Sequence, residues 1–211
     1  MALGAAVAVT AVAPGDAAAA AARKRAASRP AVQPPQCPTL GSRPVVFAKT
    51  LSGTSFATQD GLEIRLAGVM APGESGETVT PSVSDAARDA LANALRAGPL
   101  TLAAMGTPDR YGRVTAQAFA GGSWVQGTLL TSGVLRTSPD GVSLPCARQL
   151  LEAEDRARLA QSGHWRDGVF ALRTPEQLRS RVGTFQIVEG EVTTASTNKG
   201  RAYTVYWRKS H

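Results

Sequence analysis

Residues 64–72 read Ile-Arg-Leu-Ala-Gly-Val-Met-Ala-Pro, and this stretch carries most of the information on the fold. Its apolar character is typical of a buried strand, and Arg65 is the only charged residue in it. The strand ends at Met70, an uncharged residue followed by alanine and proline. The sequence therefore predicts one buried strand that contains a single arginine, and the other elements are assigned relative to this strand.

Two further strands are predicted before this one. Residues 44–50 and 54–58 have the β-branched and aromatic composition of strands, and the strand around Arg65 extends over residues 62–69. Asp60-Gly61 favours a tight hairpin turn, because both positions tolerate positive φ angles. These segments predict a β-meander of three strands.

A helix and two more strands are expected next. The segment from Ser84 to Gly98 has the composition of a helix, with Ser84 or Ser82 as its N-cap and Asp85 and Asp89 at its positive end. Its buried face is expected to contain four residues, Ala87, Leu91, Ala94 and Leu95. Two strands should follow, over residues 99–105 and 114–120.

Two helices should complete the main domain, over residues 124–132 and 145–161, the second closed by Gly163. On the second helix five residues recur at helical spacing and should face the core: Cys146, Leu150, Ala153, Ala157 and Ala160. Beyond it, residues 184–195 and 201–207 flank Asn198-Lys199-Gly200 and predict an added β-hairpin. The fold class is therefore mainly β with helices (α+β), a five-stranded OB-type barrel with a C-terminal hairpin.

The flanks differ from this core in composition. Residues 1–22 combine an apolar run with small residues, as a secretory signal peptide does, although an alanine-rich tail is the alternative because no basic residue precedes Arg23. The run is shorter than the ~20 residues of a membrane span. Residues 23–44 are rich in proline and are expected to be a linker, residues 45–165 the barrel domain and residues 166–211 a basic extension.

The charge of the chain is unevenly distributed. Its formal net charge is +7, yet residues 37–165 contain eleven basic and eleven acidic side chains, so the excess lies in the flanks. A general basic surface is therefore not indicated, and any anion binding should be local.

The two cysteines, Cys37 and Cys146, lie far apart and lack metal-binding spacing. If the protein is exported, to the periplasm or the medium, a disulfide between them is expected; two unrelated thiols are the alternative.

Four separated motifs closely resemble the staphylococcal-nuclease-like (thermonuclease) family across residues 45–165. They are the strand at 64–72, Asp-Arg-Tyr-Gly-Arg at 109–113, Trp-Val-Gln-Gly-Thr-Leu-Leu-Thr-Ser-Gly at 124–133 and Gly-His-Trp at 163–165. The resemblance implies an enzyme that cuts the phosphodiester backbone of DNA or RNA, usually with calcium. In this family two arginines clamp the scissile phosphate and a glutamate assists the attacking water.

The resemblance places Arg65 and Arg113 at the two clamp positions, where paired guanidinium donors answer the charge that builds on phosphoryl oxygens. Arg110 and Tyr111 match positions that contact the nucleotide. Each has a simpler alternative: the arginines can pair with surface carboxylates such as Asp109, and Tyr111 can be a turn or core aromatic.

The acidic positions of the family are altered. Thr54 and Met70 stand where the resemblance implies two metal-binding aspartates, and a hydroxyl and a thioether are poor ligands for calcium. Glu74 lies one residue later than the family's glutamate, so it is either a repositioned general base or a solvated loop acid.

Two functions follow as hypotheses. The first is a thermonuclease-like protein that acts on, or descends from enzymes that act on, single-stranded DNA or RNA, with Arg65, Arg113 and Glu74 as catalytic candidates and hydrolysis in doubt. The alternative is a non-catalytic binding or structural module of the cell envelope, with a protein partner.

Overall fold

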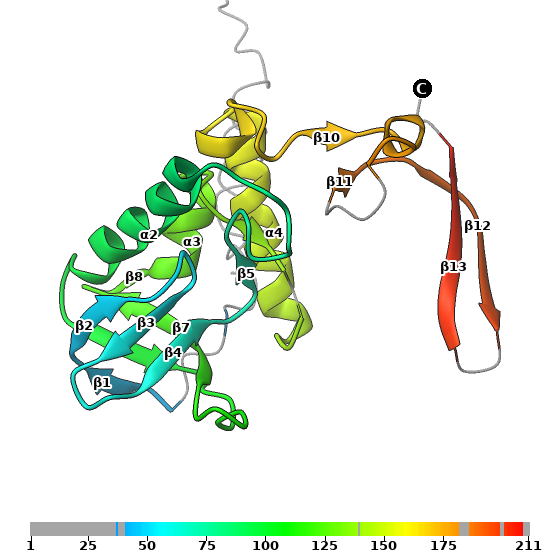
Figure 1. Ribbon diagram of the computed structural model, residues 1–211. Coiled ribbons are helices and arrows are strands. Elements are labelled where there is room, and N and C mark those ends of the chain that lie inside the picture. Colours follow the sequence, from blue (N-terminus) through cyan, green and yellow to red (C-terminus); the bar gives the residue numbers. More distant parts are fainter. Residues whose placement is uncertain (1–36, 38–40, 139, 182–185, 199–200, 209–211) are drawn as a thin grey trace, which may run out of the picture. The chain divides into compact units, whose positions relative to one another are not determined.

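The computed structural model of the chain describes residues 37, 41–138, 140–181, 186–198 and 201–208. The predicted signal peptide and most of the predicted linker lie outside these residues. The architecture is α+β, as the sequence predicts, with one mixed sheet and helices packed against it (Figure 1).

The main sheet has the strand order β1-β6-β7-β4-β3-β2, and β8 pairs with β7. Most neighbours are antiparallel, but β4 and β7 run parallel. The strands are β1 (Arg43–Val45), β2 (Phe47–Thr50), β3 (Ser55–Thr58), β4 (Glu63–Leu66), β6 (Leu100–Ala103), β7 (Val114–Ala120) and β8 (Ser123–Trp124).

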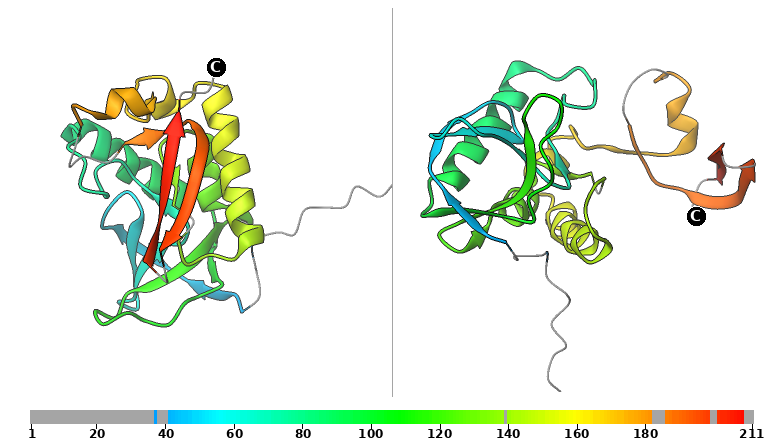
Figure 2. Two further views of the ribbon diagram at one scale, coloured as in Figure 1. Left: turned by 90° about the vertical axis from the view of Figure 1, so that its right-hand side faces the viewer. Right: turned by 90° about the horizontal axis from the view of Figure 1, so that it is seen from below.

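The two ends of this strand order are covalent neighbours. β1 pairs with β6 and β2 pairs with β3, yet only Val46 separates β1 from β2. The sheet therefore curls until its edges approach, which produces the OB-type arrangement (Figure 2). The prediction of a single strand over residues 44–50 is wrong, because this segment changes partner at Val46 to join both edges.

The Asp60-Gly61 turn occurs as predicted, with Gly61 at φ +83°. Short strands β5 (Val69–Met70) and β9 (Arg136–Thr137) pair antiparallel outside the main sheet.

Three helices cover the core: α2 (Pro81–Leu95), α3 (Val125–Thr131) and α4 (Leu144–Leu159). On α2 the predicted face is buried at Ala87, Leu91 and Leu95. The predicted start of α2 is wrong: the N-cap is Thr80, and Pro81 occupies the first turn, where its missing N–H costs nothing. Neither Ser82 nor Ser84 caps the helix, and its first turn contains no acidic residue.

Helix α3 is attached to the sheet through Gln126, which is fully buried. Its amide accepts a hydrogen bond from the N–H of Ala118 and donates one to the carbonyl of Ala116 on β7. The core between helices and sheet is aliphatic, and its fully buried large side chains include Phe56, Ile64, Leu66, Leu91, Leu95, Leu102, Leu130, Leu135 and Leu150.

Helix α4 buries Cys146, Leu150, Ala153 and Ala157, as predicted, but Ala160 is exposed because the helix already ends at Leu159. Cys146 forms a disulfide with Cys37, with a Cα–Cα distance of 4.4 Å and a sequence separation of 109. The bond attaches the segment that precedes the barrel to α4.

The C-terminal residues form small elements of their own. They are the 3-10 helices η1 (Gly163–Trp165) and η2 (Pro175–Leu178), the parallel pair β10 (Leu172–Arg173) and β11 (Ile187–Val188), and the antiparallel hairpin β12 (Glu191–Asn198) with β13 (Arg201–Arg208). The hairpin is thus confirmed. Over the described ranges, it pairs with no strand of the main sheet, and no helix is long and apolar enough to cross a membrane.

Candidate functional site

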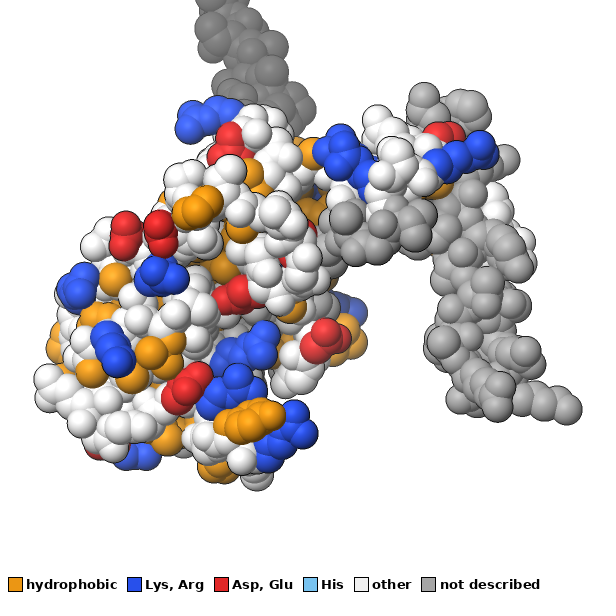
Figure 3. All heavy atoms as spheres, viewed as in Figure 1, with side chains coloured by type: hydrophobic (Ala, Val, Ile, Leu, Met, Phe, Trp, Pro, Cys, Tyr) orange, Lys and Arg blue, Asp and Glu red, His pale blue; other side chains and the backbone are white. Residues whose placement is uncertain are grey.

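Arg65 lies on β4, and Arg113 lies in the loop directly before β7, the strand that runs parallel to β4. β4 and β7 run parallel with Arg65 opposite Thr115, and Arg113 precedes Thr115 by two residues. Because alternate residues of a strand share a face, the two Cα atoms lie about 8 Å apart on one side. Arg65 is exposed, and its guanidinium makes no ion pair or hydrogen bond with any residue that the structure describes. Figure 3 shows a group of basic side chains, in blue, around a hydrophobic side chain, in orange, on the face that it views.

The loop that carries Arg113 is held by Asp109. One carboxylate oxygen accepts hydrogen bonds from the backbone N–H groups of Tyr111 and Arg113, and the other accepts one of 2.8 Å from Nε of Arg113. Gly112, at φ +78°, permits the turn between them. The hydrogen bond from Arg113 lowers the pKa of Asp109, and the same bond raises the pKa of Arg113. The predicted surface pairing of Arg113 therefore occurs, and it fixes the loop.

Tyr111 is enclosed by two guanidinium groups but open to solvent. The guanidinium carbons of Arg110 and Arg113 lie 4.7 and 5.1 Å from its ring centroid, and the residue is 66% exposed. A core role for Tyr111 is thus excluded. An exposed aromatic ring with two cations beside it can stack a base next to a bound phosphate.

Glu74 is part of an enclosed hydrogen-bond network, not a solvated loop acid. Its carboxylate accepts hydrogen bonds from the hydroxyls of Ser52 and Thr54 at 2.7 and 2.8 Å, and from the N–H of Ala71 at 3.1 Å. Thr54 is only 2% exposed. All three donors point at one carboxylate, so the Glu74 side chain is held in place by these neighbours.

A β-turn brings this carboxylate back into the site. The N–H of Glu74 donates to the carbonyl of Ala71, and the turn contains Pro72 followed by Gly73 at φ +89°. Proline and then a glycine with positive φ are the central residues of a type II turn. The turn accommodates the additional residue that precedes Glu74, so that the Glu74 side chain reaches Thr54.

Arg136 is a component of this site that the sequence analysis did not identify. It faces Met70 across the β5–β9 pair, with Nη2 3.0 Å from the methionine sulfur, and it also donates to the hydroxyl of Ser75. Its side chain is 7% exposed and lies 4.0 Å from Glu77. Burial lowers the pKa of Arg136, and nearby carboxylates oppose the shift. The available signal in the sequence was an arginine directly after two apolar residues, Val134 and Leu135.

The donor set does not fit calcium. Thr54 directs its hydroxyl hydrogen at Glu74, Met70 offers only a thioether, and the guanidinium of Arg136 lies against that thioether. Calcium requires six to eight oxygen ligands and is repelled by a neighbouring cation. Over the ranges that the structure describes, no group of three or more His, Cys, Asp or Glu residues could hold a metal ion.

The cationic strands and the carboxylate network are adjacent. Ser55 is the register partner of Arg65, and its hydroxyl lies 2.9 Å from that of Ser52, which donates to Glu74. A cleft of about 400 Å³ opens beside Glu74, towards α2. Arg65 on β4 and Glu74 in the turn after β5 are therefore connected through Ser55 and Ser52.

Residues 63–167 match the family model described as staphylococcal nuclease homologue. The matched segment contains both strand arginines, Glu74 and Arg136, and begins after Thr54. No curated protein gives a significant match to the chain.

Proposed function

Because residues 63–167 make this chain a member of the staphylococcal nuclease homologue family, we propose that its barrel binds the phosphodiester backbone of single-stranded nucleic acid without calcium-dependent cleavage. The observation that carries the proposal is the common face of Arg65 and Arg113, with the exposed Tyr111 ring beside them. Guanidinium groups bind phosphate through paired, charged donors, and an aromatic ring stacks bases of any sequence.

The proposed binding is local, in keeping with the neutral charge of residues 37–165. Arg65 is available to a phosphate without losing a partner, whereas Arg113 would exchange or share Asp109. Arg110 supplies a third cation next to Tyr111. Three phosphate contacts correspond to a slope of about −2 for log K against log salt concentration on a single strand.

The absence of calcium-dependent cleavage is proposed from the chemistry of the site. The carboxylate of Glu74 already accepts three hydrogen bonds, and the two positions that would supply metal carboxylates carry Thr54 and Met70. A general base alone contributes about 10²–10⁴-fold, which is small against the barrier of phosphodiester hydrolysis. Binding is therefore the activity that these residues support best.

The test is the binding of a fluorescently labelled oligothymidylate and an oligouridylate, followed by anisotropy at several salt concentrations with a chelator present. We expect salt-sensitive binding that weakens in the double variant Arg65→Gln, Arg113→Gln and loses about 1.4 from the salt slope. Arg148→Gln is the matched control, because Arg148 is an exposed arginine on helix α4.

The same oligonucleotides are then incubated with calcium, with other divalent ions and with chelator, and the products are separated by electrophoresis. Cleavage that needs a metal and disappears in the double variant would contradict the non-catalytic half of the proposal. Binding that is absent, or equal in the wild type and the double variant, would reject the nucleic-acid site and favour a protein partner in the cell envelope.

We also propose that the protein works outside the reducing cytoplasm, in the periplasm or the medium. The support is the disulfide between Cys37 and Cys146, since such bonds persist in oxidising compartments. Fractionation of cells that produce the full chain tests this: recovery of only reduced protein from the cytoplasm would refute it.

A further inference from the structure

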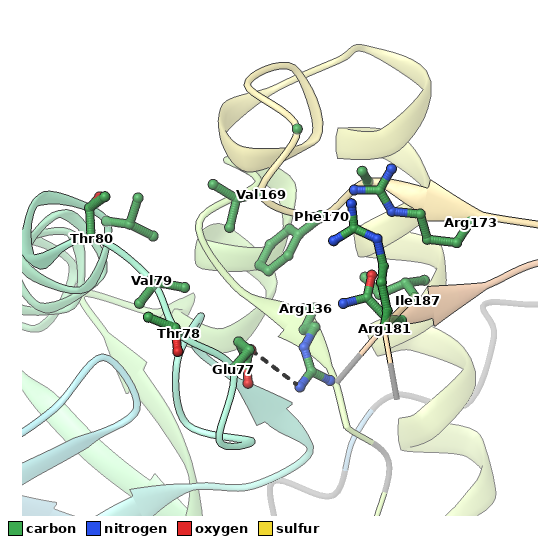
Figure 4. Close-up of a pocket in the computed structure, with 14 residues that line it drawn as sticks. Glu77, Thr78, Val79, Thr80, Arg136, Val169, Phe170, Arg173, Arg181 and Ile187 are labelled. Atoms are coloured by element: carbon green, nitrogen blue, oxygen red, sulfur yellow. Dashed lines mark ion pairs between the residues drawn. The ribbon is translucent and has the colours of Figure 1, made fainter. Parts of the chain in front are cut away.

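A second cavity, of about 340 Å³, lies between the loop that precedes α2 and the segment that follows η1 (Figure 4). Thr78 and Val79 form one side of it, and Val169, Phe170 and Arg173 form the other. The latter three residues lie beyond the segment that matches the family. The cavity is therefore a feature that this chain adds to the family domain.

One wall of the cavity is cationic. Arg136, Arg173 and Arg181 all line it, and Figure 4 shows the side chains of Arg173 and Arg181 next to each other. Among the described residues that line the cavity, Glu77 is the only carboxylate, and it lies 4.0 Å from Arg136. Guanidinium groups bind phosphate and carboxylate groups through paired, charged donors.

A buried donor points to the same chemistry. The Nε–H of Arg173 is excluded from solvent and has no hydrogen-bond partner among the residues that the structure describes. Buried donors in folded proteins are nearly always satisfied, because an unmade hydrogen bond costs free energy. An anionic oxygen in the cavity would satisfy this donor.

Another part of the lining is apolar and preformed. Phe170 is 3% exposed, and its ring is held by His164 and Trp165 with centroid distances of 5.5 and 5.3 Å. Val169 and Ile187 continue this surface. Apolar walls with a few convergent polar groups are typical of small-molecule sites, and the volume lies in their usual range.

We propose that this cavity binds a small organic anion, with its phosphate or carboxylate against Arg173 and Arg181 and an apolar or aromatic group against Val169, Phe170 and Ile187. The site is separate from the strand arginines and does not depend on nucleic-acid binding. Phosphate and carboxylate are both bound by guanidinium groups, and titration with a probe of each kind shows which of the two the cavity prefers.

Calorimetric titration of the full oxidised chain at low ionic strength tests the proposal, with phenyl phosphate, benzoate, inorganic phosphate and neutral benzyl alcohol as probes. We expect one of the two aromatic anions to bind more tightly than inorganic phosphate, and benzyl alcohol not to bind at millimolar concentration. The variant Arg173→Gln, Arg181→Gln should weaken the aromatic anion about tenfold or more, because each removes a charge-assisted hydrogen bond.

The matched control is Arg179→Gln, since Arg179 is exposed in the same segment and does not line the cavity. Val169→Ser should weaken the aromatic anion but not inorganic phosphate. Methyl signals of Val169 and Ile187 should shift on addition of the anion, which also reports whether each variant remains folded; the single Arg173→Gln and Arg181→Gln variants serve if the double variant does not fold. Equal affinity in the wild type and the arginine variants, or no binding of either aromatic anion, would overturn the proposal.

Discussion

Replacing Glu74 by alanine should destabilise the protein. This loss of stability is expected if the Glu74 carboxylate has a structural role, and it is not expected if the carboxylate is only a catalytic base. The substitution removes the acceptor of three hydrogen bonds, from Ser52, Thr54 and the N–H of Ala71. The residues Thr54 and Ala71 are each 2% exposed, so two donors would remain buried without their acceptor. A general base on a mobile loop would instead be lost with little change in stability.

The magnitude follows from the burial of the two donors. An unsatisfied buried donor costs about 1–3 kcal/mol, so two cost about 2–6 kcal/mol. The true value should lie near the lower end, about 2–3 kcal/mol, because the Thr54 hydroxyl can rotate and water can enter through the adjoining cleft. For a domain of this size that corresponds to a decrease in Tm of about 5–10 °C. Glu74→Gln keeps one acceptor oxygen and should cost about 1 kcal/mol.

The assay is urea unfolding of the oxidised chain, followed by circular dichroism. Glu152→Ala is the control, because Glu152 is exposed on α4 and its loss should change stability by less than about 0.5 kcal/mol. Combining Glu74→Ala with Thr54→Val gives a double-mutant cycle, in which we expect a coupling energy of about 1–2 kcal/mol. A Glu74→Ala variant as stable as the Glu152→Ala control would refute the network.

Three further predictions concern the disulfide, the arginine loop and the tight approach beneath the site. Replacing Cys37 and Cys146 by serine should lower stability by about 4–5 kcal/mol, because the bond closes a 109-residue loop; an unchanged urea midpoint would contradict this. Asp109 should titrate below its ordinary pKa of 3.8, because Arg113 donates to its carboxylate, so its contribution to stability is present above that pH and is lost as the pH falls through the lowered value. Carboxyl NMR shifts measure this titration, and a midpoint at or above 3.8 would disprove the assignment. Gly53→Ala should destabilise the fold by about 1–3 kcal/mol in thermal unfolding, because the new methyl group would lie 2.5 Å from a buried neighbour; unchanged Tm would show that the turn moves freely.

Much of the fold is predictable because its signals are local. Alternating apolar residues predict β4 and β7, and Asp60-Gly61 predicts the turn that Gly61 makes at φ +83°. The helix predictions fail where two local signals compete. Ser84 is a good N-cap by type, but Pro81 allows the helix to begin one turn earlier.

The split of residues 44–50 into β1 and β2 is not a local property. The composition of that segment as a whole favours a strand, and the segment is extended on both sides of Val46. Only the closure of the sheet demands that β1 pair with β6 while β2 pairs with β3. The exposure of Ala160 is likewise not predictable from local sequence, because the apolar helical spacing continues in the sequence after the helix has ended at Leu159.

The sequence by itself determined the OB-type fold, the presence of Arg65 and Arg113, and uncharged side chains at positions 54 and 70, because residue types and short spacings carry that information. The tertiary structure decided what these side chains contact. Glu74 meets Thr54 across 20 residues, and Arg136 meets Met70 across 66. Such contacts depend on which strands pair and how the chain turns between them, and the free energy of those pairings is shared over the whole fold.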